Sequence, residues 1–285
     1  MIKTIAKDLM NEDFPYGIIP SKRVEILTIL RKNRLSYIPV VSEDTCELKG
    51  TISISDIAKN PDENQIAVLL NRTPKTVQET DDIKTVVKLL LSDSQNIVCV
   101  INNDRKLLGV ITPREIISKA KMLTTIDKRV LDYTKFDITS IYSETPLPAA
   151  WEIMRLSRSN ALCVVNFNGN LEGMIDDSDL IGASSIIQSR EVEVNIGSED
   201  AWAWQTSDFL YIVKKTLKLP TDVRVKDVMT TEVITIVKSE TIAKAATKMK
   251  DNNVENIPVI DSFGTIIGII RDKDLLLVLL QQLES

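Results

Sequence analysis

The chain contains no histidine among its 285 residues, and this absence removes several classes of function. Without imidazole there is no Ser-His-Asp or Cys-His nucleophilic site and no histidine general acid or base. Nearly every zinc site is excluded as well, because the three cysteines cannot supply four ligands alone. We therefore expect a protein that is not an enzyme and that has no catalytic residue, catalytic cofactor or metal.

Cysteine is also too scarce for a disulfide framework. Cys99 and Cys163 lie in short apolar runs, at 97–101 and 162–165, and Cys46 lies in a polar stretch. A cysteine in an apolar run typically behaves as a small buried hydrophobic residue. We expect Cys99 and Cys163 to lie in buried strands and Cys46 to lie in a turn, without disulfides.

An excess of positive charge and a long apolar run are both missing. The formal net charge is -5, which gives no basic surface for a nucleic-acid backbone. The apolar run at 274–281 is far shorter than the roughly 20 residues that cross a bilayer, and residues 1–8 lack the apolar core of a signal peptide. We expect a soluble cytoplasmic protein with no nucleic-acid or membrane partner.

What the sequence does contain is a fourfold internal repeat. Each copy closes with a glycine, two apolar or small residues and a polar stretch that ends in a carboxylate, at 50–56, 109–115, 173–179 and 268–274. Each closing glycine lies 39 or 40 residues after an anchor residue, namely Met10, Leu70, Tyr133 and Met229. Such regular spacing predicts four copies of one structural unit. We place them at 1–61, 62–122, 123–183 and 221–285, with an insert at 184–220.

Hydrophobic periodicity predicts the order of elements in each copy. Residues 24–30 and 242–249 space their apolar side chains as amphipathic helices do, whereas 37–41 and 257–260 are short, continuously apolar and rich in branched side chains, as buried strands are. A polar turn, a strand that begins near the repeated glycine and a last helix follow. The predicted unit is strand, helix, strand, strand, helix, which makes an α/β protein.

The fullest copy is the fourth, and it resembles the cystathionine β-synthase (CBS) domain. The resemblance lies in Val225-Lys-Asp-Val-Met-Thr230, Asn256-Ile-Pro-Val-Ile260 and Gly268-Ile-Ile-Arg-Asp-Lys-Asp274. It covers nearly the whole chain apart from the insert. Four CBS repeats imply two pseudo-twofold Bateman modules, repeats 1 with 2 and 3 with 4, packed as a disc. That organisation is similar to the gamma regulatory subunit of AMP-activated protein kinase and its archaeal look-alikes.

The resemblance also implies a set of ligand-binding residues. In the family, a Ser or Thr of the closing unit holds phosphate, an Asp holds ribose, and backbone groups near the start of the repeat contact adenine. The phosphate and ribose positions are Ser53 and Asp56, Thr112 and Glu115, Asp176 and Asp179, and Arg271 and Asp274. The adenine positions are Tyr16, Thr76, Thr139 and Thr235.

The same residues have a second interpretation, because a hydroxyl side chain followed three residues later by a carboxylate is also the pattern of a helix capping box. Thr112 and Glu115 fit this better than Ser53 and Asp56, since Pro113 suits the first helical position and Glu115 departs from the family Asp. We therefore rank the first repeat highest for ligand binding. The fourth ranks second, because the Arg271 guanidinium suits phosphate while Asp274 takes ribose.

The third repeat is expected to reject phosphate. Asp176 places a second carboxylate near Asp179, and like charges there repel an anion. An uncharged adenosyl group, a cation or an empty cleft is expected instead. The chain also lacks the basic residues that the kinase gamma subunits carry ahead of the central strand. The cations that remain for a phosphate, each with the alternative of a solvated surface charge, are Lys22, Arg23, Arg34, Arg158 and Arg271.

The insert at 184–220 holds a cluster of aromatic residues with acidic neighbours. It is interpreted either as a satellite core or as a surface for a partner protein, since Trp and Tyr concentrate at interface hot spots. The residues concerned are Trp202, Trp204, Phe209, Leu210 and Tyr211.

The resulting hypothesis is a regulatory, energy-sensing protein that binds AMP, ADP or ATP and relays occupancy to a partner, a kinase or another regulated enzyme. The alternatives are a sensor of S-adenosylmethionine and a structural CBS protein with empty clefts. A monomer and a homodimer are both compatible with the sequence.

Overall fold

The computed structural model of the chain describes residues 4–60, 63–93, 95–193 and 210–284. Within these ranges it contains four three-stranded sheets of identical topology and one two-stranded sheet. In each three-stranded sheet the first strand is parallel to the middle strand, and the third is antiparallel to it. The expected α/β class is confirmed.

Each repeat follows the predicted order of strand, helix, strand, strand, helix. The elements are, in repeat 1, β1 (Gly17–Ile19), α2 (Arg23–Asn33), β2 (Tyr37–Ser42), β3 (Leu48–Ser53) and α3 (Ile54–Lys59); in repeat 2, β4 (Thr76–Gln78), α5 (Ile83–Leu91), β5 (Val98–Ile101), β6 (Leu107–Ile111) and α6 (Pro113–Lys119); in repeat 3, β7 (Ser140–Tyr142), α7 (Leu147–Ser157), β8 (Ala161–Val165), β9 (Leu171–Asp176) and α8 (Asp177–Ala183); in repeat 4, β12 (Ile236–Val237), α9 (Ile242–Asn252), β13 (Asn256–Ile260), β14 (Ile266–Arg271) and α10 (Asp272–Glu284).

The middle strand of each sheet is the apolar run that the sequence singles out. Branched apolar side chains suit a strand covered on both faces, and every residue of β5 is buried. Cys99 and Cys163 are fully buried in β5 and β8, and burial raises the pKa of their thiols to about 12 and about 11. Cys46 is exposed in the turn between β2 and β3. All three cysteine predictions are confirmed.

Short helices that the sequence analysis did not predict open the repeats. They are α1 (Ala6–Leu9), α4 (Ile66–Leu69) and the 3₁₀ turns η2 (Val130–Tyr133) and η3 (Val225–Asp227); a further 3₁₀ turn, η1 (Lys121–Thr125), links the two halves of the chain. Each opening helix packs into the partner repeat. Ala6 and Leu9 of α1 are buried in the core of repeat 2, and Val225 of η3 is buried in the core of repeat 3.

A backbone clasp joins the two repeats of each pair at the repeated glycines. The residue after the glycine exchanges two hydrogen bonds with a residue just past the partner's anchor. Thr51 and Asn71 do so at 3.0 and 2.9 Å. The other three clasps are Asn11 with Val110, Lys135 with Ile269 and Met174 with Thr230. A Cβ on Gly50 would lie 2.5 Å from the Asn71 carbonyl oxygen, so the close approach requires glycine. The predicted pairing of repeats 1 with 2 and 3 with 4 is confirmed.

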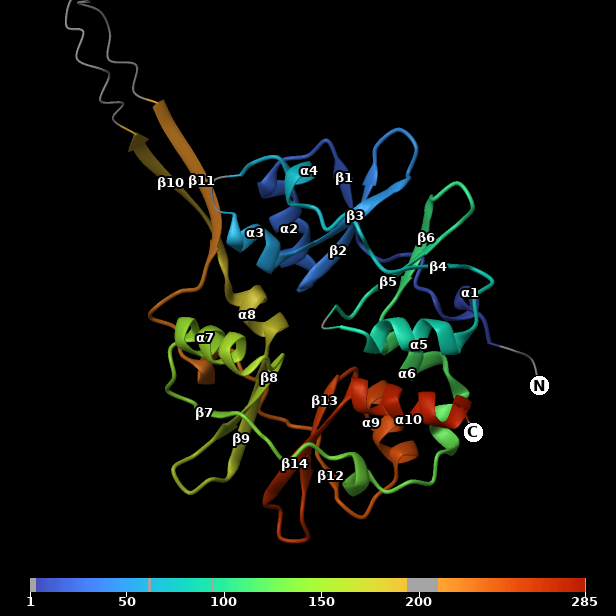
Figure 1. The fold of residues 1–285 in the computed structure, drawn as a ribbon. Coiled ribbons are helices and arrows are strands. Elements are labelled where there is room, and N and C mark those ends of the chain that lie inside the picture. Colours follow the sequence, from blue (N-terminus) through green and yellow to red (C-terminus); the bar gives the residue numbers. More distant parts are fainter. Residues whose placement is uncertain (1–3, 61–62, 94, 194–209, 285) are drawn as a thin grey trace, which may run out of the picture.

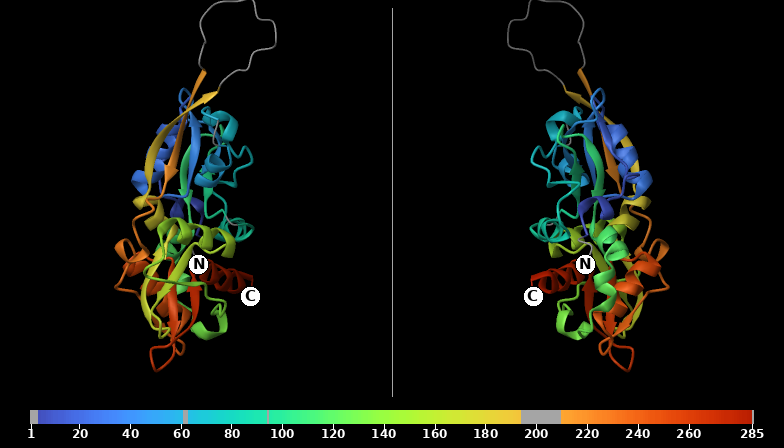
Figure 2. Two further views of the ribbon diagram at one scale, coloured as in Figure 1. Left: turned by 90° about the vertical axis from the view of Figure 1, so that its left-hand side faces the viewer. Right: turned by 90° about the vertical axis from the view of Figure 1, so that its right-hand side faces the viewer.

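The two pairs meet through their helices. Helices α5 and α6 of repeat 2 pack against α9 and α10 of repeat 4 and share one hydrophobic core with them. Helix α2 of repeat 1 packs against α8 of repeat 3. Figure 1 shows repeats 1 and 2 in the upper half of the molecule and repeats 3 and 4 in the lower half. Edge-on, the four form the expected flattened disc (Figure 2).

The insert forms a hairpin of β10 (Ser185–Glu193) and β11 (Leu210–Lys218), which the sequence analysis did not predict. It lies against α2 of repeat 1, where Ile186 packs on the core of that repeat (Figure 1). Trp202, Trp204 and Phe209 lie outside the described residues, and Leu210 and Tyr211 begin β11. Both interpretations of this aromatic cluster therefore stay predictions.

No helix in the described part of the chain is long and apolar enough to cross a membrane.

Candidate functional site

In repeat 1, the first-ranked residues Ser53 and Asp56 lie together where β3 passes into α3. Ser53 is the N-cap residue and is 4% exposed. Its hydroxyl accepts a hydrogen bond from the Asp56 N–H at 3.0 Å, and Asp56 Oδ2 accepts from the Ser53 N–H at 3.0 Å. The Ser53 hydroxyl also donates to Asp56 Oδ2 at 2.6 Å. Ser53 and Asp56 therefore form a complete capping box, in addition to being the first-ranked ligand-binding residues.

Repeat 2 keeps the bond from the N-cap N–H to the carboxylate but lacks the bond from the backbone N–H of Glu115 to the N-cap hydroxyl. Glu115 Oε2 accepts from the Thr112 N–H at 2.9 Å and from the Thr112 hydroxyl. Pro113 occupies the first position of α6. Only the carboxylate half of the predicted capping box is present here, because the Thr112 hydroxyl accepts no hydrogen bond from the Glu115 N–H. The reciprocal box is complete at Ser53 and Asp56, so the expectation that Thr112 and Glu115 form the better box is wrong.

In repeat 3, two carboxylates share the start of α8. Asp176 Oδ1 accepts from the Asp179 N–H at 3.0 Å, and Asp179 Oδ2 accepts from the Asp176 N–H at 3.1 Å. Burial, together with the nearby charge of Asp176, raises the pKa of Asp179 to about 6. Asp179 Oδ1 lies 3.8 Å from the Arg34 guanidinium of repeat 1. The negative charge is thus partly balanced by a cation from the other module.

Repeat 4 places Arg271 and Asp274 at the end of β14 and the start of α10. Asp274 is 7% exposed, and its Oδ2 accepts from the Arg271 N–H at 2.9 Å. Burial raises the pKa of Asp274, against the Arg271 N–H and the positive charge of Lys135. The Nε of Arg271 is buried with no hydrogen-bond partner among the described residues, and no carboxylate there pairs with its guanidinium.

One carboxylate oxygen caps the helix in all four repeats, and the second oxygen differs among them. Asp179 Oδ1 and Asp274 Oδ1 face cations, with Lys135 lying 3.7 Å from Asp274. Over the described ranges, Asp56 Oδ1 and Glu115 Oε1 have no partner for a hydrogen bond or ion pair. Capping and ligand binding therefore do not exclude each other, because each takes a different oxygen.

The four adenine positions do not share one geometry. Tyr16 is 47% exposed and lines a surface depression beside α2. Thr76 begins β4, opposite Cys99 of β5. The carbonyl oxygens of Thr139 and Thr235 are already occupied, since they accept from the Cys163 N–H at 3.3 Å and from Lys248 Nζ at 2.8 Å.

The cations proposed as phosphate ligands differ in burial and in the groups that they contact. Arg23 is 2% exposed, and its guanidinium donates to the carbonyl oxygens of Ile57, Asn60 and Glu63. Both interpretations of Arg23, as a phosphate ligand and as a solvated charge, are therefore wrong, because the side chain binds the end of α3 and the loop after it. Arg34 pairs with Asp179. Lys22 is exposed before α2, and Arg158 is exposed after α7.

Carboxylates of several repeats gather where the two modules meet. Ser36 of repeat 1 donates to Asp177 Oδ2 of repeat 3 at 2.6 Å. Burial, opposed by the Ser36 hydrogen bond and reinforced by Asp176 and Glu255, raises the pKa of Asp177 to about 7. The pKa of the Tyr37 hydroxyl is raised by burial and then by the charges of Asp177, Asp56 and Asp93.

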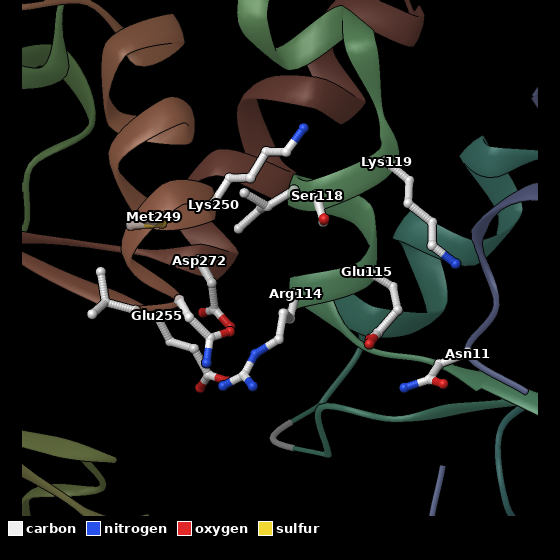
Figure 3. A pocket seen from close by; sticks show the side chains of 12 residues that line it. Asn11, Arg114, Glu115, Ser118, Lys119, Met249, Lys250, Glu255 and Asp272 are labelled. Atoms are coloured by element: carbon white, nitrogen blue, oxygen red, sulfur yellow. The ribbon is translucent and has the colours of Figure 1, made fainter. Parts of the chain in front are cut away.

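A cavity of about 270 Å³ lies between repeats 2 and 4, lined by α6, by α9 and the residues after it, and by the start of α10. Figure 3 shows Arg114 and Glu115 on one wall, and Glu255 and Asp272 on the other. Asp272 is 3% exposed. Burial, reinforced by the charge of Glu255, raises the pKa of Asp272 to about 7. Of the candidate residues named above, the cavity brings in only Glu115.

The sequence analysis missed Asp177, Glu255 and Asp272. Asp177 and Asp272 occupy the same position of their repeats, four residues after the repeated glycine, where the first two repeats have Ile54 and Pro113. An aspartate at an otherwise apolar position was the available signal. Among the described residues, no group of three or more acidic or cysteine side chains is arranged to hold a metal ion.

Comparison with known proteins finds the CBS domain four times, at residues 6–63, 66–121, 130–186 and 225–281. The protein MJ1225 of Methanocaldococcus jannaschii is 24% identical over 272 residues, which are 88% of this chain and 89% of that protein. MJ1426 of the same organism is 31% identical over 140 residues, or 44% of this chain and 77% of that protein.

Two solved structures are similar over the whole chain. An uncharacterized conserved protein of Pyrococcus horikoshii is 27% identical with a TM-score of 0.63, and the match covers 97% of this chain and 100% of that one. The crystal structure of MJ1225, described as a candidate archaeal homolog of g-AMPK, is 21% identical with a TM-score of 0.72 and the same coverage. At that identity, the likeness to MJ1225 concerns the fold.

Proposed function

The chain belongs to the CBS-domain family, and from this premise we propose that it is a regulatory sensor of adenine nucleotides without catalytic activity of its own. CBS-domain proteins are generally regulatory ligand binders. The ligand class is AMP, ADP or ATP, bound first in repeat 1 and second in repeat 4. A partner protein, a kinase or another regulated enzyme, responds to whether a nucleotide is bound.

The observation that carries this proposal is the unused oxygen of Asp56. Its Oδ2 caps α3, whereas Oδ1 has no partner among the described residues. An ionised carboxylate oxygen accepts well from a ribose hydroxyl, in a charge-assisted hydrogen bond of about 1.5 to 3 kcal/mol. The charge of Asp56 also reaches the phenol of Tyr37, near Asp93 and Asp177 of two other repeats. A ligand at Asp56 therefore lies where several repeats meet.

Repeat 4 is the second site, on a different observation. The Arg271 guanidinium has no carboxylate partner in the described part of the chain, and its buried Nε lacks an acceptor. A phosphate supplies acceptors for such a planar donor. Asp274 lies three residues further on and keeps one oxygen toward Lys135 rather than toward the helix.

Ligand occupancy acts through the contact between modules. Ser36 and Arg34 of repeat 1 bind Asp177 and Asp179 of repeat 3, so a ligand beside Asp56 borders contacts that hold the modules together. A ligand shifts the population of module geometries by as much as its affinities for those geometries differ. The partner protein binds one geometry better than the other.

The test is calorimetric titration of AMP, ADP and ATP into the full chain and into two matched variants. Asp56→Asn keeps an oxygen for the cap but loses the charge, and we expect it to weaken binding about 10 to 100 fold. Glu115→Gln makes the same change at the same position of repeat 2 and is expected to have little effect. Equal losses in both variants, or a loss in Glu115→Gln alone, would contradict the ranking.

A second candidate function is a structural CBS protein with empty clefts, favoured because all four carboxylates accept a hydrogen bond from the N-cap N–H of their helix. A nucleotide at about 100 times its dissociation constant adds roughly 2.7 kcal/mol to the native state, which raises the thermal midpoint by several degrees. Unchanged melting curves with AMP, ADP, ATP and S-adenosylmethionine would establish the structural function instead.

A further inference from the structure

Asp177 and Asp272 are equivalent residues with unequal surroundings. Each is the first residue of the last helix of its repeat, and each donates its backbone N–H to a carbonyl of the preceding strand region, Asn160 at 3.0 Å and Glu255 at 2.8 Å. Asp177 Oδ2 accepts from the Ser36 hydroxyl of the other module at 2.6 Å. Asp272 Oδ2 is buried with no partner among the described residues.

The difference arises from the facing repeat. The position that holds Ser36 in repeat 1 holds Asn96 in repeat 2, and no hydrogen bond joins Asn96 to Asp272 in the part of the chain described, where Asn96 Oδ1 is also buried without a partner. Asp272 Oδ1 accepts from the Lys273 N–H at 2.6 Å, so only Oδ2 lacks a donor. A buried carboxylate oxygen without a donor is costly, and a cavity lies directly beside this one (Figure 3).

The cations on the cavity wall do not serve Asp272. Arg114 Nη2 donates to Glu255 Oε1 at 3.2 Å, and Lys119 Nζ donates to the Met10 carbonyl at 2.5 Å. Figure 3 shows the ammonium group of Lys250 pointing away from the Asp272 carboxyl. The neighbouring Lys273 Nζ donates to the Asp93 carbonyl at 2.7 Å. The charged groups around Asp272 are thus Glu115, Glu255 and Asp274 on the acidic side and Arg114, Lys119, Lys250 and Lys273 on the basic side.

We propose that this cavity binds a small organic amine, whose ammonium group donates a hydrogen bond to Asp272 Oδ2 and supplies between repeats 2 and 4 the contact that Ser36 supplies between repeats 1 and 3. A cation satisfies the buried carboxylate and offsets the charge of Glu255. Glu115 Oε1, on the facing wall, is a second acceptor. The wall carries three carboxylates and three cations, but Arg114 binds Glu255 and Lys119 binds the Met10 carbonyl. The atom that lacks a partner is the acceptor Asp272 Oδ2, which attracts a cation and repels a phosphate. The proposal does not rest on nucleotide binding.

Two methionines at equivalent positions of repeats 3 and 4 provide an NMR probe of the cavity and its control. Met249 is 2% exposed and lines the cavity, and Met154 occupies the same position of repeat 3, 4% exposed and outside the cavity. The full chain with ¹³C-methyl methionine is titrated with putrescine, with 1,4-butanediol as its uncharged analogue and with inorganic phosphate. We expect a saturable shift of the Met249 methyl signal with putrescine and none at Met154. Equal binding of butanediol or phosphate at Met249, or no shift with putrescine, would overturn the proposal.

Two equivalent variants test the carboxylate. Asp272→Asn is expected to weaken putrescine binding about tenfold or more, because it removes the charge that holds the ammonium group. Asp177→Asn makes the same change outside the cavity and should leave the affinity unaltered. Equal affinities in both variants refute the assignment to Asp272.

A pH series tests the same point without any variant. Putrescine needs the ionised carboxylate, and the pKa of Asp272 is raised to about 7. The ionised fraction therefore rises about tenfold between about pH 6 and about pH 8, and the affinity should rise with it. An affinity that is constant or falls over this interval counts against the site.

Discussion

At the start of each final helix, the two oxygens of one carboxylate have different partners. Oδ2 of Asp56 caps α3 and fixes the side chain, which leaves Oδ1 held in one direction at little further entropic cost. The capping box thus positions a binding group instead of competing with it. The same reasoning makes Asp179 and Asp274 less available, because Arg34 and Lys135 already face their second oxygens.

Repeat 3 tests the role of charge at these positions. Replacing Asp176 by Thr removes a carboxylate beside Asp179 and adds a hydroxyl donor, so we expect the variant to bind one more AMP per chain than the wild type. The number of bound AMP molecules is counted by calorimetry. Asp176→Asn removes the charge without the hydroxyl and separates the two effects. An unchanged number of AMP molecules in Asp176→Thr would show that charge does not close this site.

Arg23 shows how a charged side chain can hold a repeat together. Its guanidinium is buried against the carbonyl oxygens at the end of α3 and in the following loop. Replacing Arg23 by Leu leaves these acceptors without a donor, and we expect a loss of about 1 to 3 kcal/mol in the free energy of unfolding. Denaturant unfolding measures this loss, with Lys22→Leu as the control at an exposed neighbouring position. Equal stability of the two variants would mean that water replaces the guanidinium without penalty.

At the scale of elements, the exchanged opening helices and the glycine clasps define the pair. Helix α1 of repeat 1 completes the core of repeat 2, and α4 of repeat 2 completes the core of repeat 1. The clasp between Thr51 and Asn71 lies beside this exchange and brings two backbones into direct contact. Helices of four residues have no periodicity to detect, and for this reason the sequence predicted the pairing but not the exchange.

Gly50 and Gly17 provide a matched pair for testing the clasp. A methyl group on Gly50 would lie 2.5 Å from the backbone oxygen of Asn71, whereas on Gly17 it would lie 2.5 Å from the flexible end of Ile26. We expect Gly50→Ala to lower the free energy of unfolding by about 1 to 3 kcal/mol more than Gly17→Ala does, because backbone cannot move aside as a side chain can. Thermal or denaturant unfolding decides between them. A larger loss of unfolding free energy in Gly17→Ala would show that the backbone of the clasp moves to accommodate the methyl group.

At the scale of the whole molecule, buried carboxylates lie where the modules meet. The pKa values of Asp177 and Asp272 are raised to about 7, and that of Asp179 to about 6. The unfolded chain has aspartate pKa values near about 3.9. The folded state therefore binds more protons in the interval between, so these groups stabilise it fully below about pH 4 and lose that effect as the pH rises through about 7.

We expect the denaturation midpoint to fall from about pH 5 to about pH 8, contrary to the common rise over the acid range. Asp272→Asn should flatten this dependence and raise the free energy of unfolding at about pH 8 by about 1 to 3 kcal/mol, because it removes a buried charge with no donor. Glu47 and Glu284 have lowered pKa values, but they lie at the surface. Stability that rises between about pH 5 and about pH 8 in the wild type would refute this account.

The sequence predicts the parts of the fold that repeat and misses those that depend on the facing module. The spacing of glycines predicts four units, and apolar runs predict the central strands, because both properties are local. The burial of Arg23 depends on a loop about 40 residues away. Asp272 Oδ2 lacks a donor where repeat 2 has Asn96 in place of the Ser36 of repeat 1, and this is visible only once repeats 2 and 4 face each other.

The exchange of opening helices constrains how such a chain arises. A lone repeat would lack the helix that completes its core and half of its clasp, and it would present both to another copy of itself. A one-repeat ancestor would therefore have met these contacts only as a symmetric dimer. Duplication of its gene would have joined the two subunits covalently, and a second duplication would have copied the joined pair. In the present chain, α1 has the place that such a dimer would give it, because it belongs to the first repeat and packs in the core of the second.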